Sequence, residues 1–379
     1  ALPAGPPPIR RSSSAGSPGQ SPLPGRKAGR ESLARARGES AEGEHFRFYG
    51  HQAGGHFCLV KPAPGSRRIR VKPHAPRGSA AEELELPAEQ VVLKPLDELE
   101  HRFYQLMLDE VPAFVPHMAH LFGTKTLSLS QVLDMTAEAE NAEESFLQPR
   151  MRTHAYQTYI VLQDLASALR RPRILDLKMG FKQRSKRHST RKRERCRLKA
   201  SSSTSQALGF RVCGIHAEGR VYDKYWGRRL QTSELRSVLA EFFLHERASE
   251  AERRGALAQL LGRLRRLREI VAGMPHWRFW NTSLLFLHDG EEPARPPEMR
   301  LIDFAHCTRV RGTAPDGEFI ACLRNLEFFL EALRDGCPYD PWILEQLVEA
   351  PAEALQDAEE AESDEGETWC GGGACASAA

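Results

Sequence analysis

Two charged side chains on one apolar stretch are the first candidates for chemistry. Residues 172–180 read PRILDLKMG, with Asp176 and Lys178 two positions apart. Successive side chains on a β-strand point to opposite faces, so these two share a face. An acid and a base together on an otherwise apolar strand indicate a ligand-binding pair; a buried salt bridge is the alternative. Gly180 ends the stretch.

A second set of residues has the order found where phosphoryl groups are transferred. Lys94 ends the apolar stretch 91–94, and Glu100 lies on the helix expected to follow it. Protein kinases place a strand lysine and its glutamate partner in this order. Asp303 follows an apolar strand and precedes Phe304, as the magnesium-binding aspartate of kinases does. Taken singly, Lys94 could be a surface residue and Asp303 an ordinary strand-end acid.

Positive charge is concentrated directly after the Asp176/Lys178 strand. The run begins with Lys182 and Arg184 and stays basic to Lys199. Its first residues are predicted to bind an anionic acceptor beside that strand. For 186–195, nuclear import or nonspecific polyanion binding is an equal alternative. A nucleic-acid module is not expected, because the run has no interleaved aromatic residues.

Hydrophobic periodicity predicts the elements that must position these residues. A strand–turn–strand around Gly54-Gly55 comes first, followed by a loop at 62–79. Residues 123–150 are expected to form a loop or insertion with a helical patch. The predicted strands are 91–94, 159–162 and 174–177, with a hairpin of 284–287 and 299–302; the predicted helices are 96–108, 235–243, 256–271 and 319–333. This is an α+β pattern.

Composition excludes several classes of protein. The 379 residues are 41% hydrophobic and 27% charged, with a formal net charge of +3, which is typical of a globular protein. The eight cysteines form no CxxC pair, so we expect reduced thiols rather than disulfides or a zinc site. No apolar run is long enough to span a bilayer, and the Pro- and Ser-rich N-terminus is not a secretory signal. Residues 1–44 and 350–379 are predicted to be disordered tails.

These motifs occur together in the inositol polyphosphate kinase family, which the chain resembles over residues 45–345. The family signature P-x-x-x-D-x-K-x-G is matched by Pro172, Asp176, Lys178 and Gly180. The other matching segments are 51–56, Glu100-x-x-Phe103-Tyr104, 283–285 and 302–305. Segments 203–205, 208–214 and 223–228 are most like the inositol hexakisphosphate kinases.

The resemblance implies a two-lobed, kinase-like fold related to ATP-grasp and protein-kinase folds. The domain would span residues 45–349, with a small lobe at about 45–162 and a large lobe at about 163–349. The hairpin at 51–57 would cover ATP. The other implied nucleotide contacts are Lys94, Glu100, the hinge residues Gln163 and Leu165, Asp176, and Asp303, which would also hold Mg²⁺. The implied substrate contacts are Lys178, Lys182, Arg184 and Ser283.

The expected reaction is phosphorylation of inositol hexakisphosphate by ATP and Mg²⁺ to a diphosphoinositol pentakisphosphate, with Asp176, Lys178 and Asp303 as catalytic residues. If the acceptor were a hydroxyl, Asp176 could act as general base. An acceptor phosphate is already ionised near neutral pH, and Asp176 would then orient Lys178 or the ribose. We expect a monomer in the cytoplasm, the nucleus or both.

Three departures from the family pattern bear on substrate preference. The segment 316–323 lacks the second glycine of its motif, Gln163 stands where glutamate is common, and the basic insertion before Ser201 is longer than expected. Two alternatives therefore stay open. One is a multikinase that phosphorylates hydroxyls of less phosphorylated inositols; the other is a catalytically silent scaffold that binds polyanions.

Overall fold

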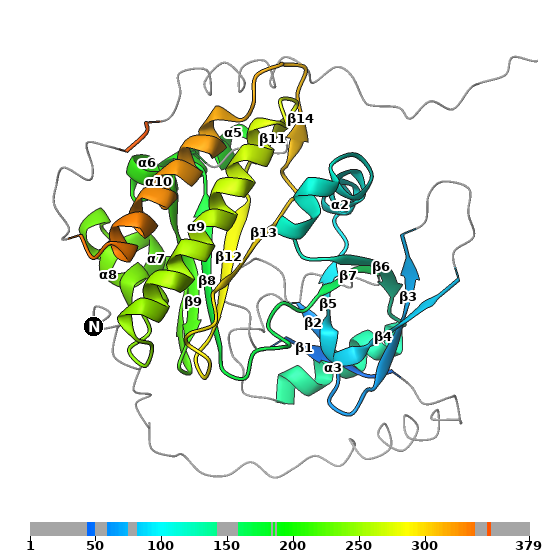
Figure 1. Cartoon of the computed structure of the whole chain (residues 1–379). Helices are drawn as coiled ribbons and strands as arrows, with labels where there is room; N and C mark the ends of the chain where they lie inside the picture. Colours follow the sequence, from blue (N-terminus) through cyan, green and yellow to red (C-terminus); the bar gives the residue numbers. More distant parts are fainter. Residues whose placement is uncertain are drawn as a thin grey trace, which may run out of the picture.

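The computed structural model describes residues 44–49, 59–74, 82–141, 158–182, 185, 188–337 and 347–349, with the backbone alone for 136–141. Within these ranges the chain forms two main antiparallel sheets, each with its own helical cover (Figure 1). The predicted α+β class is confirmed. Of the predicted tails at 1–44 and 350–379, only Glu44 is described, and it pairs with Lys125; the hairpin tip at 51–57 also lies outside the described residues.

The first sheet builds the small lobe, in the strand order β1-β2-β5-β7-β6-β3-β4. Its strands are β1 (Phe46–Phe48), β2 (Val60–Pro62), β3 (Arg68–Pro73), β4 (Leu84–Pro87), β5 (Val91–Pro95), β6 (Leu121–Thr126) and β7 (Thr158–Gln163), with the short 3₁₀-helix η1 (Ala88–Gln90) before β5. Helix α3 (Leu129–Asn141) packs Val132 and Met135 into the apolar core of this sheet.

The second sheet builds the large lobe, in the order β10-β9-β8-β12-β13. Its strands are β8 (Pro172–Met179), β9 (Phe210–Ala217), β10 (Arg220–Tyr222), β12 (Ser283–Asp289) and β13 (Glu298–Ile302). The long helices α9 (Glu250–Ala272) and α10 (Gly317–Arg334) pack side by side over one face, with α8 (Thr232–Phe243) next to α10 (Figure 1). Helix α7 (Lys224–Arg229) packs on β9.

Helix α2 (Glu98–Glu110) and the 3₁₀-helix η2 (Pro112–His117) follow β5 in the chain and pack against the large lobe. Asp97 caps α2, accepting from the backbone N–H groups of Leu99 and Glu100. Although α2 follows a small-lobe strand, its buried residues Phe103 and Tyr104 belong to the large-lobe core. Helix α2 therefore fixes the end of β5 against the large lobe. Strands β11 (Trp277–Arg278) and β14 (Thr308–Arg309) form a separate two-stranded sheet.

The strands and helices predicted from periodicity are confirmed, with shifted ends. In the predicted first hairpin, the described part of the second strand is β2, and the turn at Gly54-Gly55 lies outside the described residues. Two loop predictions were wrong. Strand β3 lies in the predicted loop 62–79, because Ile69 and Val71 alternate with exposed residues and are buried. Strand β6 occupies the start of the predicted insertion 123–150, where α3 forms the expected helical patch.

The described cysteines, Cys196, Cys213, Cys307, Cys322 and Cys337, are free thiols. Among the described residues, no helix has the length and apolar character to cross a membrane.

Candidate active site

Strand β8 presents Asp176 and Lys178 on one face, as the sequence predicted. The Lys178 ammonium donates to the backbone oxygen of Asn281 and lies 3.7 Å from the Asp303 carboxylate. The strand ends at Gly180, whose φ of +113° is accessible to glycine and rarely to other residues. A Cβ there would lie 3.0 Å from the Lys182 carbonyl oxygen. The last glycine of the motif is therefore required by the turn that follows β8.

Lys94, Glu100 and Asp303 meet at the junction of the lobes. The Lys94 ammonium at the end of β5 lies 2.8 Å from Glu100 Oε1 and 2.8 Å from Asp303 Oδ1. Burial alone would lower the pKa of Lys94, but the two carboxylates raise it above its ordinary value. Burial raises the pKa of Glu100, and Lys94 opposes that shift. Lys94 is therefore a permanent cation, held between two acids from different elements.

Asp303 is positioned by an unusual backbone conformation and by its aromatic neighbour. It follows β13 with φ of +67°, a left-handed conformation that costs free energy in a residue other than glycine. Phe304 stacks on Phe103 at 4.5 Å between ring centroids, and its N–H donates to Glu100 Oε1. Strained backbone of this kind collects at functional sites. The α2 aromatic residues thus hold the carboxylate of Asp303 toward the two lysines.

Asp176 is nearly inaccessible, with 2% of its surface exposed. Burial, followed by the negative charge of Asp303, raises its pKa to about 6. Its Oδ1 has no hydrogen-bond partner among the described residues. These residues also contain no cluster of three or more metal-ligating side chains. A divalent ion would thus be held by Asp303 together with ligand oxygens, a donor set that suits Mg²⁺ bound to a nucleotide.

A cavity of about 180 Å³ opens beside these groups. Its cationic side chains are Lys94, Lys178, Lys192, Lys199, Arg211, Lys224 and Arg228, and its carboxylates are Asp97, Glu100 and Asp303. Partial burial and the nearby Arg228 lower the pKa of Lys199, and burial lowers that of Arg211. Cations crowded in this way are stabilised by a polyanionic ligand.

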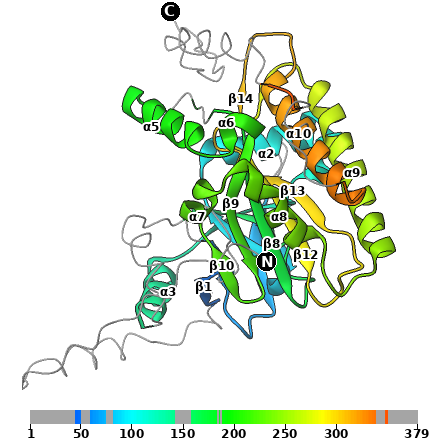
Figure 2. The same ribbon diagram turned by 90° about the vertical axis from the view of Figure 1, so that its left-hand side faces the viewer.

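Helix α5 (Thr190–Ser201) brings part of the basic run to the cavity. Ser189 caps its first turn, and only Cys196 and Ala200 are buried. Lys192, Cys196 and Lys199 recur at helical spacing and line the cavity. On the opposite side, Arg197 pairs with Glu194. Figure 2 shows α5 standing out from the lobe beside α6 (Ser205–Leu208).

The remaining predicted site residues lie elsewhere or outside the description. Lys182 is exposed and does not line the cavity; its backbone N–H donates to Glu318. Arg184 lies outside the described residues. Ser283 is buried on β12, opposite Lys178 in the strand register. Gln163 and Leu165 lie where β7 leaves the small-lobe sheet.

Sequence reasoning missed several cavity residues. Besides the cations of α5 they are Arg211, Lys224, Arg228, His188 and His306. The His306 ring accepts from or donates to Ser185 Oγ at 2.8 Å and lies edge-on to the His188 ring. Its place three residues after Asp303 was an available signal. For Arg211 on β9 and for Lys224 and Arg228 on α7, the sequence offered no signal beyond the resemblance of their segments to the family.

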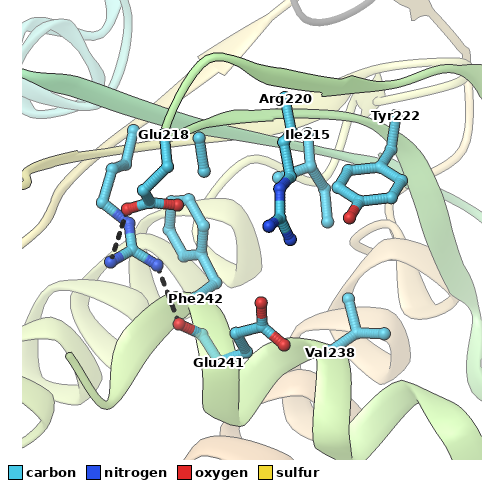
Figure 3. Close-up of a pocket in the computed structure, with 9 residues that line it drawn as sticks. Ile215, Glu218, Arg220, Tyr222, Val238, Glu241 and Phe242 are labelled. Atoms are coloured by element: carbon cyan, nitrogen blue, oxygen red, sulfur yellow. Dashed lines mark hydrogen bonds and ion pairs between the residues drawn. The ribbon is translucent and has the colours of Figure 1, made fainter. Parts of the chain in front are cut away.

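A second, smaller cavity lies at the other end of the large-lobe sheet, under α8 (Figure 3). Its volume is about 20 Å³, enough for about one water. The Arg173 guanidinium pairs with Glu218 at 3.2 Å and donates to the Glu241 carbonyl oxygen at 2.8 Å. Because it cannot admit a phosphate group, we assign this cavity no part in the site.

The two lobes, with a strand lysine, a helix glutamate and a strand-end aspartate meeting between them, define a protein of the kinase-like class. Residues 159–331 match the sequence model of the family described as inositol polyphosphate kinase. Human inositol hexakisphosphate kinase 3 is 31% identical over 215 residues, covering 47% of this chain and 52% of that protein. Over these residues the chain is similar to the inositol polyphosphate kinase family.

Other relatives agree with this family. An uncharacterised inositol polyphosphate kinase of Schizosaccharomyces pombe is 29% identical over 233 residues, covering 55% of this chain and 23% of that protein. The alignments thus span about half of the human relative and less of the yeast one. The fold is similar to that of the inositol phosphate multikinase Ipk2 from S. cerevisiae, solved with ADP and Mn²⁺. The TM-score is 0.51 at 21% identity, covering 64% of this chain and 98% of that one.

Proposed function

We propose that this protein transfers the γ-phosphoryl group of ATP to a highly phosphorylated inositol, inositol hexakisphosphate in the first place. The observation that carries the proposal is the cavity itself: seven cationic side chains around about 180 Å³, beside a carboxylate positioned to hold a metal–nucleotide complex. Bringing a polyanion against ATP requires this excess of positive charge.

Each residue of the site would have a separate role in the transfer. Lys94, fixed by Glu100, would neutralise the nucleotide phosphates. Asp303 would hold Mg²⁺, which when bound offsets the negative charge on the phosphate oxygens. Lys178 lies between this carboxylate and the cationic wall, so it would stabilise charge on the phosphoryl group in transit. Lys192 and Lys199 would grip the acceptor.

The burial of Asp176 supports a phosphate acceptor over a hydroxyl. A general base must come within hydrogen-bond reach of the proton that it removes. Asp176 is 2% exposed and does not line the cavity. An ionised phosphate needs no base, so an electrostatic role for Asp176 toward Lys178 is consistent with pyrophosphate formation.

One observation favours the multikinase alternative. The His306 ring lines the cavity and is oriented by Ser185, so it could serve as a base for an acceptor hydroxyl. The two functions differ in substrate: a multikinase phosphorylates tris- and tetrakisphosphates in preference to the hexakisphosphate.

The test is incubation of the full chain with ATP, Mg²⁺ and either inositol hexakisphosphate or inositol trisphosphate, with products separated by charge. We expect a product more anionic than the hexakisphosphate, absent with Asp303→Ala. Turnover of the trisphosphate alone would support the multikinase. Turnover of neither would overturn the enzymatic proposal in favour of a silent polyanion-binding scaffold.

Paired variants of α5 test the acceptor site separately. Lys192→Gln and Lys199→Gln should each raise the acceptor KM about tenfold, the effect of losing one charge-assisted contact, and flatten its salt dependence. Arg191→Gln is the matched control, because Arg191 is exposed on the same helix and does not line the cavity. If all three variants raised the acceptor KM equally, the assignment of Lys192 and Lys199 to the acceptor site would be refuted.

A further inference from the structure

The buried carboxylate of Asp164 connects three separate parts of the small lobe. It follows β7 directly and is 4% exposed. Its Oδ1 accepts from the Tyr49 hydroxyl at 2.9 Å and from the Ala166 backbone N–H at 3.0 Å. Its Oδ2 pairs with the Lys61 ammonium. Tyr49 follows β1 and Lys61 lies on β2, so one side chain joins the edge of the sheet to the lobe connection.

The backbone around Asp164 is fixed as firmly as its side chain. Its N–H donates to the Gln90 carbonyl at 2.8 Å, and its carbonyl accepts from the Ser167 hydroxyl at 2.8 Å. Gln90 immediately precedes β5, the strand that carries Lys94. The position of the connection between the lobes is thus tied to the strand that presents the phosphate-binding lysine.

A buried ion pair of this kind is weak evidence for a role in stability. Removing two charges from water costs free energy that their attraction often only just offsets. The Lys61 ammonium also lies 5.7 Å from the centre of the Tyr49 ring. Burial, reinforced by Asp164, raises the pKa of Tyr49 above its ordinary value, so the hydroxyl remains a donor. The cluster therefore specifies one geometry at the connection.

We propose that Asp164 is a positioning residue for the nucleotide. Its carboxylate sets the orientation of the 163–165 backbone, where the adenine edge would be read, and Tyr49 and Lys61 hold that carboxylate in place. This inference rests on the proposed ATP-dependent function. It concerns nucleotide affinity, and it leaves the acceptor cavity and its cations untouched.

The test measures ADP binding directly, in parallel with turnover. A fluorescent ADP analogue with Mg²⁺ is titrated into the full chain, and urea unfolding is followed for each variant. Asp164→Asn should weaken ADP binding about tenfold and raise the KM for ATP equally, with kcat and the acceptor KM within about twofold of the parent, since about one charge-assisted hydrogen bond is lost. Tyr49→Phe should act in the same direction, about threefold, because it removes one neutral bond.

Two further variants separate positioning from stability. The double variant Lys61→Met, Asp164→Leu replaces the ion pair by apolar side chains, a change that often preserves stability. It should stay folded in the absence of urea and still bind ADP weakly, with a urea midpoint lowered because the Tyr49 hydroxyl and the Ala166 N–H lose their acceptor. Asp289→Asn is the matched control: Asp289 is a buried carboxylate that accepts backbone N–H groups of Arg170 and Arg171, at the far end of the large-lobe sheet. It should leave ADP affinity unchanged.

The outcomes are distinguishable. If Asp164→Asn binds ADP like the parent, or if Asp289→Asn weakens ADP binding equally, the positioning role is wrong. If the double variant recovers parental affinity, the Ala166 hydrogen bond does not orient the connection and the inference falls. A parent chain that fails to bind ADP would overturn the proposed function, and this inference with it.

Discussion

Replacing Asp176 by asparagine should raise the free energy of unfolding while lowering the catalytic activity. The pKa of Asp176 is raised from 3.8 to about 6, mainly by burial. That shift corresponds to about 3 kcal/mol of free energy against the charged form. Its Oδ1 has no hydrogen-bond partner among the described residues, so an amide of the same shape removes the buried charge and orphans no donor.

The effect has a defined pH window. An acid whose folded-state pKa is raised binds more protons when folded, so its contribution to stability is lost as pH rises from about 4 through about 6. The burial penalty is complete above pH 6. We therefore expect Asp176→Asn to raise the free energy of unfolding by up to about 3 kcal/mol at pH 8 and by about half as much at pH 5. Urea unfolding at the two pH values measures the difference.

Asp316 provides the matched comparison, because its pKa is also raised to about 6 by burial. Unlike Asp176, it accepts backbone N–H groups from both Phe279, at 2.7 Å, and Phe319, at 2.9 Å. An asparagine there would turn its NH₂ toward one of these donors, and a buried unsatisfied donor costs about 1–3 kcal/mol. We expect Asp316→Asn to lose stability. If Asp176→Asn also loses stability at pH 8, or gains equally at pH 5, the charge argument is refuted.

Three further substitutions test the site and its supports. Lys94→Met should lower kcat/KM at least a hundredfold, because Glu100 then has no ammonium to orient; a loss under tenfold would remove Lys94 from the mechanism. Gly209→Ala should cost about 2–4 kcal/mol in urea unfolding, since φ is +77° and a Cβ would lie 2.6 Å from Cys322 Sγ. Gly219→Ala, at φ +74° with no atom within 4 Å of a Cβ, should cost only the strain of about 1 kcal/mol; equal costs would contradict the steric argument.

Periodicity predicted the elements that bury one continuous face. Strand β8, the β12–β13 hairpin and helices α8 to α10 each carry enough apolar residues at a period of two or 3.6 to be visible in the sequence. The shared face of Asp176 and Lys178 followed from the same alternation. Strand β3 was missed because its two buried residues stand among charges and prolines, so composition outweighed a short alternation.

For the basic run, the sequence alone does not show which cations face the cavity. Helix α5 has two buried residues and six basic ones, so neither amphipathicity nor propensity separates cations that serve the site from those that face solvent. The separation comes from how Cys196 and Ala200 seat the helix on the lobe, which turns Lys192 and Lys199 inward. A prediction that weighted the start of the run therefore favoured Lys182, which is exposed and does not line the cavity.

The convergence of Lys94 and Asp303, 209 residues apart in the chain, depends on backbone conformations that composition does not encode. Lys178 is held by the carbonyl of Asn281 and the carboxylate of Asp303, and both residues have positive φ. Asn281 lies two residues before β12 and Asp303 directly follows β13, so the chain bends on both strands at the open end of the hairpin, next to the lysine. Relaxing either bend would turn a partner of Lys178 away. The strain is stored at the two points that aim the ammonium between the Asp303 carboxylate and the other cations of the cavity, which is where phosphoryl transfer would need it.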